Sequence, residues 1–431
     1  MKPLSVRSIS AYAALGAPLK ALTLTTTLYL PAFYAVEGKL GLTEVGFIFL
    51  IMRTFDIVID PFFGWVSDRT NIAMGRRRFW ILLGIVPLAI SIWMVFRPSR
   101  PVSANLFIGW LGLFYLAWTV VTVSHTAWAA DMTADKGALR RLIGWREWAG
   151  IIGMLAIMVV PAIQEHHEKS LSERMGALGI ALTVAVLLAG ASAVVAVPET
   201  SAGVSTAPFH QFMRHLGRSS QLRRVLIADL LVGCGYGMTS ALMLFIAKSW
   251  LHVAGSFSTI MLVYFIGMLI SVPGWIRCAD HIGTKSTYRL AIGLLAGAQL
   301  LILVVPTGRP LLAGMLWFLH GILTGAYQFG LNGIMAETAE RDRDATGETL
   351  SGVYFALLAT TNKLGYAAAI GVVYPLLDAL GFSPQRIGHG TLSLLITYAC
   401  LPAVFFAASA WCVGRGDHQQ TLDHVEYASI V

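Results

Sequence analysis

Long apolar segments recur along almost the whole chain and are separated by short polar stretches. A bilayer core is crossed by a helix of roughly 20 apolar residues, because backbone groups in lipid must bond within their own segment. The 431 residues, of which 56% are hydrophobic and 13% charged, have room for about twelve such helices. We therefore predict an all-α integral membrane protein with about twelve transmembrane helices, rather than a soluble domain with an anchor.

The apolar segments divide into two groups around one long polar stretch. Residues 198–224 are predicted to be a cytoplasmic linker between a six-helix bundle at 1–197 and a second at 225–413, and a cytoplasmic tail follows at 414–431. The sequence Pro-Phe-Phe-Gly-Trp in the second apolar segment of the first half is answered by Pro-Gly-Trp at the same place in the second half. Two such halves are typical of major facilitator transporters, which bind solute near the bilayer midplane.

Basic residues gather in the loops on one side of this predicted topology. If the first residue lies in the cytoplasm, the loops on the cytoplasmic side contain more arginines and lysines than the loops on the other side. This positive-inside pattern predicts a multi-pass protein of the inner (plasma) membrane with both termini in the cytoplasm. The net charge of +8 therefore reflects topology, and we expect no nucleic-acid partner.

No sequence pattern indicates enzyme chemistry. The four cysteines lack metal-ligand spacing, and the chain holds no HExxH, P-loop or nucleophile-elbow motif. We expect a protein that is not an enzyme and that needs no cofactor or metal. Its expected partners are a small-molecule solute, a coupling cation and the lipid bilayer, and we expect it to be a monomer.

The second apolar segment is unusual because it carries charges in its middle. In a helix, Arg53, Asp56, Asp60 and Gly64 share one face. A charged residue costs about 2.5–3.5 kcal/mol at the bilayer centre, so such residues usually face a cavity and mark an ion or solute path. One arginine cannot neutralise two carboxylates, which favours a cation or proton site at Asp56 and Asp60. The alternative is a buried salt bridge in which Arg53 neutralises one of them.

Three stretches resemble a known transporter family. They are RTFDIVIDPFFGWVSDRTNIAMGRRR at 53–78, SHTAWAADMTADKGALRRLIGWREWAGIIG at 124–153 and TGETLSGVYFALLATTNKLGYAAA at 346–369. With the signature Asp-x-x-x-Asp-Pro-x-x-Gly-x-x-x-Asp-Arg and the arginine-rich loop after it, the whole chain resembles the glycoside–pentoside–hexuronide:cation symporters, the melibiose permease family of the major facilitator superfamily. The resemblance implies secondary active, cation-coupled symport of a sugar-like solute by alternating access.

The resemblance also implies roles for particular residues. Asp56 and Asp60 are similar to the cation-binding carboxylates of the family, and Thr119 to an oxygen ligand on the fourth segment. Lys363 resembles the lysine near the cation site, where it and Arg53 would serve coupling. Human relatives of this group carry lysophospholipids, so a lipid or lysolipid transporter of the same fold is the alternative function.

Two departures from the family pattern bear on the ion and the solute. Sodium-using members commonly have a polar amide one residue before the second aspartate, where this chain has Ile59. Sodium needs several oxygen ligands whereas a proton needs one suitable carboxylate, so we expect H+ rather than Na+ as the coupling ion. The sugar-binding aspartate of the first segment is missing, and Lys20 lies at or beside its place. Lys20 either binds an anionic solute or pairs with Asp56 or Asp60.

Other polar side chains inside the apolar segments are candidates for binding the solute. The resemblance implies a solute contact for Arg146 at the start of the fifth segment. His125 and Thr122 lie on the fourth segment, and Tyr327 and Gln328 lie on the tenth. The same side chains could instead hydrogen-bond neighbouring helices, which is a common role of polar groups in membrane bundles.

Charged residues at the cytoplasmic ends of the second and third segments predict a gate. Asp68, Arg76, Arg77 and Arg78 could hold the inner side of the protein in one state. The alternative is that the three arginines only set the topology.

Overall fold

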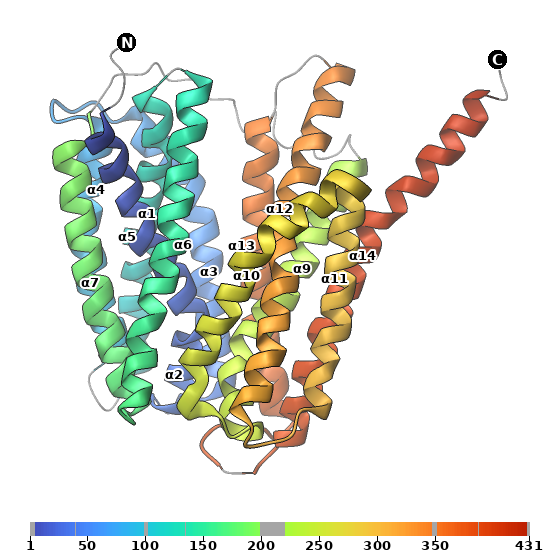
Figure 1. Cartoon of the computed structure of the whole chain (residues 1–431). Coiled ribbons are helices and arrows are strands. Elements are labelled where there is room, and N and C mark those ends of the chain that lie inside the picture. Colours follow the sequence, from blue (N-terminus) through green and yellow to red (C-terminus); the bar gives the residue numbers. More distant parts are fainter. Residues whose placement is uncertain are drawn as a thin grey trace. The chain divides into compact units, whose positions relative to one another are not determined.

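The computed structural model describes residues 5–38, 40–98, 102–133, 135–198, 220–346, 351–386 and 388–428 (Figure 1). The regular structure of these residues is helical throughout. The chain divides into two compact units. The first comprises Met1–Ser205 and Gly255–Thr259, and the second comprises Thr206–Ala254 and Ile260–Val431.

The first unit is a bundle of long helices that run side by side (Figure 1). They are α1 (Val6–Leu28), α3 (Leu42–Arg69), α4 (Arg76–Phe96), α5 (Ala104–Met132), α6 (Lys136–His166) and α7 (Leu171–Ala196), with the short α2 (Leu30–Val36) after α1. Tyr29 separates α1 from α2, and Pro31 lies in the first turn of α2, where its missing N–H does no harm. The carboxylate of Asp135 caps the start of α6, and Ser170 and Glu173 form a capping box at the start of α7.

The second unit repeats this plan. Its long helices are α9 (Ser220–Phe245), α10 (Phe257–Ile282), α11 (Thr284–Leu300), α12 (Pro310–Thr346), α13 (Ser351–Ala379) and α14 (Thr391–Ala428). α9 ends in a π-helical turn at Ile246–Trp250, and short 3₁₀ turns lie at Ala254–Ser256 and Leu301–Val304. Its core is apolar and includes the fully buried side chains of Tyr288 and Ile334.

Ten helices in the described part of the chain are long and apolar enough to cross a membrane. α1 and α3 are less apolar because α1 carries Lys20 and several threonines and α3 carries Arg53, Asp56 and Asp60. With these two, the described residues contain twelve long helices in two groups of six, as predicted. Many outward-facing side chains are apolar, for example Leu188, which is 67% exposed, as expected of a surface that meets lipid.

Glycines let pairs of helices approach closely in each unit. A Cβ atom at Gly153 of α6 would lie 2.4 Å from the carbonyl oxygen of Ala17 in α1. A Cβ atom at Gly365 of α13 would lie 2.7 Å from the carbonyl oxygen of Leu230 in α9. Both distances are far inside van der Waals contact, so the α1–α6 and α9–α13 seams depend on residues without a side chain.

Two helices extend beyond the stretches predicted to span the membrane. α9 begins at Ser220, within the stretch 198–224 predicted to be a linker, and residues 199–219 lie outside the described residues. α14 continues to Ala428, so most of the stretch 414–431, predicted to be a tail, is helical. Hydropathy marks where a chain leaves an apolar environment, whereas a helix ends where its backbone hydrogen bonds end.

Candidate functional site

Asp56 and Asp60 of α3 share one hydroxyl group from α5. The side-chain oxygen of Thr119 lies 2.9 Å from Oδ1 of Asp56 and 3.0 Å from Oδ1 of Asp60. Asp56 and Thr119 are buried, and Asp60 is half-buried. A threonine hydroxyl has a single proton, so it can donate to only one of these carboxylates at a time. The structure thus brings together the three residues that the sequence predicted as a cation site.

Arg53 lies one turn before this group on α3. Its Nη1 atom is 3.5 Å from Oδ2 of Asp56, at the long limit of a hydrogen bond. The guanidinium also lies over the rings of Tyr115 and Trp118, at 5.1 Å and 5.6 Å from their centroids. Arg53 is therefore held by two aromatic faces as well as by one carboxylate. With both aspartates ionised, these side chains carry one more negative than positive charge.

A second charged group joins α1 to α6. Lys20 donates to Oε2 of Glu147, and Nη2 of Arg146 lies 3.1 Å from Oε1 of the same carboxylate. Nη1 of Arg146 donates to the hydroxyl of Thr126 on α5 at 3.1 Å. The stem of Lys20 lies against Gly150, where a Cβ atom would be 2.8 Å from Cδ of the lysine. One carboxylate here bridges two cations, which leaves the group with a net positive charge.

The partner of Lys20 differs from the expected ones. The sequence left two partners open for Lys20, an anionic solute or one of Asp56 and Asp60; among the described residues the structure pairs Lys20 with Glu147 instead of an aspartate, and the solute contact stays a prediction. The pair is only part-buried, with exposed side-chain fractions of 33% for Lys20 and 43% for Glu147. Glu147 was missed as a partner because the contact joins α1 to α6 across more than a hundred residues. The only hint of this pairing in the sequence is that Glu147 is a carboxylate directly after Arg146, at the start of an apolar segment.

The other two candidates on α5 have different surroundings. Nε2 of His125 lies 2.8 Å from the carbonyl oxygen of Tyr12, and the two rings are in contact at 4.6 Å between centroids, tilted by 40°. A carbonyl oxygen only accepts, so Nε2 carries the proton and ties α5 to α1. The hydroxyl of Thr122 is buried and has no hydrogen-bond partner among the described residues. Of His125 and Thr122, only Thr122 has a side-chain polar atom that makes no hydrogen bond to another described residue.

The candidates of the second unit lie on α12 and α13. The hydroxyl of Tyr327 donates to Oδ1 of Asp229 at 3.3 Å and also contacts the side-chain amide of Asn362. Lys363, the next residue on α13, is half-buried. Gln328 is part of α12, but its side chain lies outside the described residues. Asp229 and Asn362 were not among the predicted site residues.

The predicted gating arginines begin α4 and contact groups of the first unit. Arg76 donates to Asp131 of α5 through Nε at 3.2 Å and Nη2 at 2.9 Å, and Nε of Arg77 donates to the same carboxylate at 2.7 Å. Arg78 donates to the carbonyl oxygen of Val197 at 2.6 Å. The side chain of Asp68, the predicted acidic partner, lies outside the described residues. Asp131 is therefore the carboxylate that the structure places with Arg76 and Arg77.

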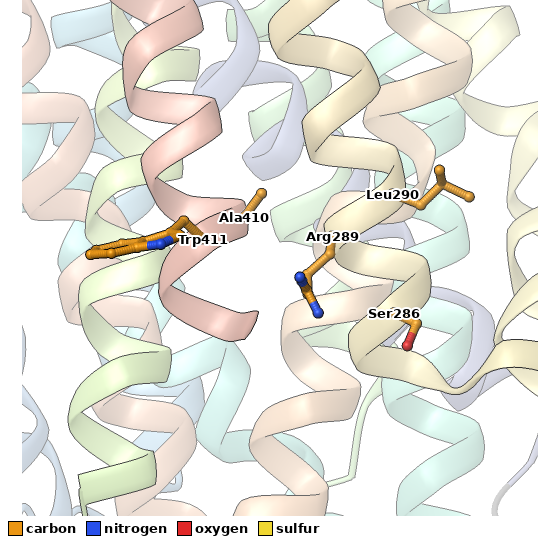
Figure 2. A pocket seen from close by; sticks show the side chains of 5 residues that line it. All are labelled: Ser286, Arg289, Leu290, Ala410 and Trp411. Atoms are coloured by element: carbon orange, nitrogen blue, oxygen red, sulfur yellow. The ribbon is translucent and has the colours of Figure 1, made fainter. Parts of the chain in front are cut away.

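A surface pocket with a volume of about 450 Å³ lies in the second unit (Figure 2). Its lining residues are Ser286, Arg289 and Leu290 of α11 and Ala410 and Trp411 of α14. None of the residues predicted to bind the cation or the solute lines it, so this pocket is separate from the predicted site.

Comparisons with known proteins agree with the resemblance seen in the sequence. The chain matches the family "MFS/sugar transport protein" over residues 11–415. It is 25% identical over 405 residues to the "Uncharacterized symporter YnaJ" of Bacillus subtilis (strain 168), covering 88% of this chain and 84% of the relative. It is 24% identical over 371 residues to the "Glucuronide carrier protein homolog" of Escherichia coli (strain K12), covering 84% of this chain and 80% of the relative.

Among solved structures, the crystal structure of the nucleoside transporter NupG has the same fold. The TM-score is 0.69 at 13% identity, and the match covers 95% of this chain and 99% of that chain. At this identity the likeness concerns the fold alone. The chain belongs to the MFS/sugar transport protein family, in the group of glycoside–pentoside–hexuronide:cation symporters that the signature on α3 predicts.

Proposed function

We propose that this protein is a secondary active transporter, not an enzyme, that carries a sugar-like solute together with a cation by alternating access. The observation that carries the proposal is the group of Asp56, Thr119 and Asp60. Two carboxylates one helical turn apart share one hydroxyl inside an apolar helix, and carboxylates placed in this way usually mark an ion path, so we assign a mobile cation to this group. Binding and release of that charge is what an ion gradient can act on. The alternative of lipid transport has no such support.

We propose H+ as the coupling ion. Sodium requires a cage of several oxygen atoms, and Ile59 supplies only an apolar side chain beside Asp60. A proton needs only a single carboxylate, and Asp56 and Asp60 provide two that share the Thr119 hydroxyl. The hydroxyl of Thr119 supports this choice, because it can donate to whichever carboxylate is ionised.

We propose that the solute carries a negative charge. Lys20, Arg146 and Glu147 form a part-exposed group with an excess positive charge, which favours a carboxylate or sulfonate on the solute. The relative named as a glucuronide carrier homolog supports an acidic sugar as the first class to test. The free hydroxyl of Thr122 adds a neutral contact on α5.

The same proposal extends to location and assembly. Ten apolar helices make this a multi-pass membrane protein. We propose the inner (plasma) membrane with both termini in the cytoplasm, because basic residues gather in the loops on that side. We also propose that a single chain is the functional unit, since both charged groups described here are complete within one chain.

Uptake into proteoliposomes tests the function. We expect an imposed inward proton gradient to drive accumulation of one of a panel of glucuronides and neutral glycosides, and a protonophore to abolish it. Asp56→Asn and Asp60→Asn should each abolish accumulation while leaving some downhill exchange, and Glu173→Gln, at an exposed carboxylate, should change nothing. Normal accumulation by both aspartate variants would refute the proposed cation site.

The choice of ion has its own test. Replacing external sodium with choline at constant pH should leave uptake unchanged, because the proposed site holds a proton. A strict sodium requirement would overturn the choice of H+ but would leave cation coupling at Asp56 and Asp60 in place.

A further inference from the structure

The second unit contains a buried carboxylate that the proposed transport mechanism does not use. Asp229 lies on α9, and only 2% of the residue is exposed. Its Oδ2 atom is 2.6 Å from the hydroxyl of Thr361 on α13. Its Oδ1 atom is 3.3 Å from the hydroxyl of Tyr327 on α12 and 3.4 Å from the amide nitrogen of Asn362 on α13. Groups from three helices thus converge on one carboxylate.

All three of these partners are neutral, which distinguishes Asp229 from Asp131, Glu147 and Glu165. Asp131 is paired with arginines, Glu147 with Lys20 and Arg146, and Glu165 with Arg174 at 2.7 Å. None of the ion pairs of the described residues includes Asp229. A buried charge without a cation is expensive, so the positive charge has to come from solution.

The hydroxyl of Thr361 can accommodate both protonation states of Asp229. Besides Oδ2 of Asp229, the Thr361 oxygen lies 3.0 Å from the carbonyl oxygen of Leu358 and 3.2 Å from that of Leu357. When Asp229 is ionised, the hydroxyl donates to Oδ2. When Oδ2 takes a proton from water, its new O–H bond donates to the Thr361 oxygen, and the hydroxyl proton turns to the Leu358 carbonyl. Neither state leaves a buried polar atom without a partner.

We propose that Asp229 is a second proton-binding site, held by Thr361, Tyr327 and Asn362 in the second unit. It binds a proton independently of Asp56 and Asp60, which belong to the first unit. Titratable groups near Asp229 and its partners are Tyr236 on α9, Tyr288 on α11, Tyr327 on α12, Tyr366 on α13 and, beside Tyr288, Cys412 on α14; Lys363 directly follows Asn362 in the sequence of α13. Transport of a second proton in each cycle rests on the proposed proton coupling. Protonation of Asp229 itself does not depend on that coupling.

Infrared difference spectroscopy of the purified protein in lipid nanodiscs tests the site without any solute. The C=O stretch of protonated carboxyl groups is followed as the pH is changed, in the wild type and in an Asp56→Asn/Asp60→Asn background. We expect one titrating band to persist in that background and to disappear on adding Asp229→Asn. Asp378→Asn, which removes an exposed carboxylate at the end of α13, should leave this band unchanged.

Two further variants make the assignment specific. Asp229→Glu keeps a carboxylate and should retain a titrating band at a shifted frequency. This shift assigns the band to position 229 even where Asp229→Asn does not fold. Tyr327→Phe should move the band to higher frequency, because the C=O group at Oδ1 loses a hydrogen-bond donor. A titrating band that is identical with and without Asp229 would overturn the proposal, and so would the absence of any band in the Asp56→Asn/Asp60→Asn background. Failure of proton-driven uptake would leave it intact.

Discussion

Replacing Asp131 by asparagine should strongly destabilise the first unit. The Asp131 side chain is 9% exposed and accepts from Arg76 and from Arg77, whose side chains are 15% and 4% exposed. Asparagine keeps the size and one acceptor oxygen but removes the charge, and this takes an anionic partner from each of two shielded guanidinium groups. Loss of one partner of a buried ion pair costs about 3–5 kcal/mol.

The structure favours the lower end of that range. Nη1 of Arg77 keeps its contact with the hydroxyl of Ser67 at 2.8 Å, and Arg76 can reach water at its exposed edge. We therefore expect a loss of about 3 kcal/mol in the free energy of unfolding, because the remaining contacts soften the loss. At about 1.4 kcal/mol per factor of ten, this is roughly two orders of magnitude in the unfolding equilibrium constant.

Equilibrium unfolding in mixed micelles, with rising dodecyl sulfate and circular dichroism as the readout, measures this loss. Glu168→Gln is the matched control, because Glu168 is exposed and its carboxylate joins no ion pair among the described residues. It should unfold at the same detergent fraction as the wild type. The reasoning fails if Asp131→Asn also unfolds at the wild-type detergent fraction, since Asp131 would then contribute no more to stability than a solvated carboxylate.

Three further outcomes are expected. Thr119→Val should abolish proton-driven accumulation while Thr119→Ser retains it, and equal activity of the two would remove the hydroxyl from the site. Lys20→Ala should weaken binding of an acidic sugar by about ten- to a hundredfold and leave a neutral glycoside unaffected, as measured by calorimetry, and unchanged affinity for the acidic sugar would remove Lys20 from the solute site. Gly153→Ala should cost about 1–3 kcal/mol in the same unfolding assay because its Cβ atom meets the backbone of α1, whereas Gly109→Ala, which has open space, should be neutral or stabilising.

The grouping of Asp56 and Asp60 with Thr119 could be predicted from the sequence because its geometry is largely local. Asp56 and Asp60 are one helical turn apart, so a single helix places them on one face, and their unusual occurrence in an apolar segment marks them. Only the oxygen from Thr119 had to come from another helix, and the family resemblance supplied it. The twelve long helices could also be predicted, because the hydropathy that indicates a membrane-spanning helix is a property of one continuous segment.

The charged pairs between helices could not be predicted in this way. Lys20 meets Glu147 because α1 and α6 pack closely, and Arg77 meets Asp131 because α4 lies against α5. Periodicity shows which face of a helix is polar, but it does not show which neighbour that face meets. The Asp229 group needs three helices at once and has no motif in the sequence.

The contact between Gly150 and the stem of Lys20 has a consequence for sequence variation. Any side chain at position 150 would collide with a long residue at position 20, because the Cβ atom would lie 2.8 Å from Cδ of the lysine. The two positions should therefore co-vary among homologues, with Ala or Ser at 150 occurring where residue 20 is short. A change of residue 20 during evolution then passes through a coupled pair of substitutions, while the glycine contact at position 153 keeps the spacing of the two helices fixed.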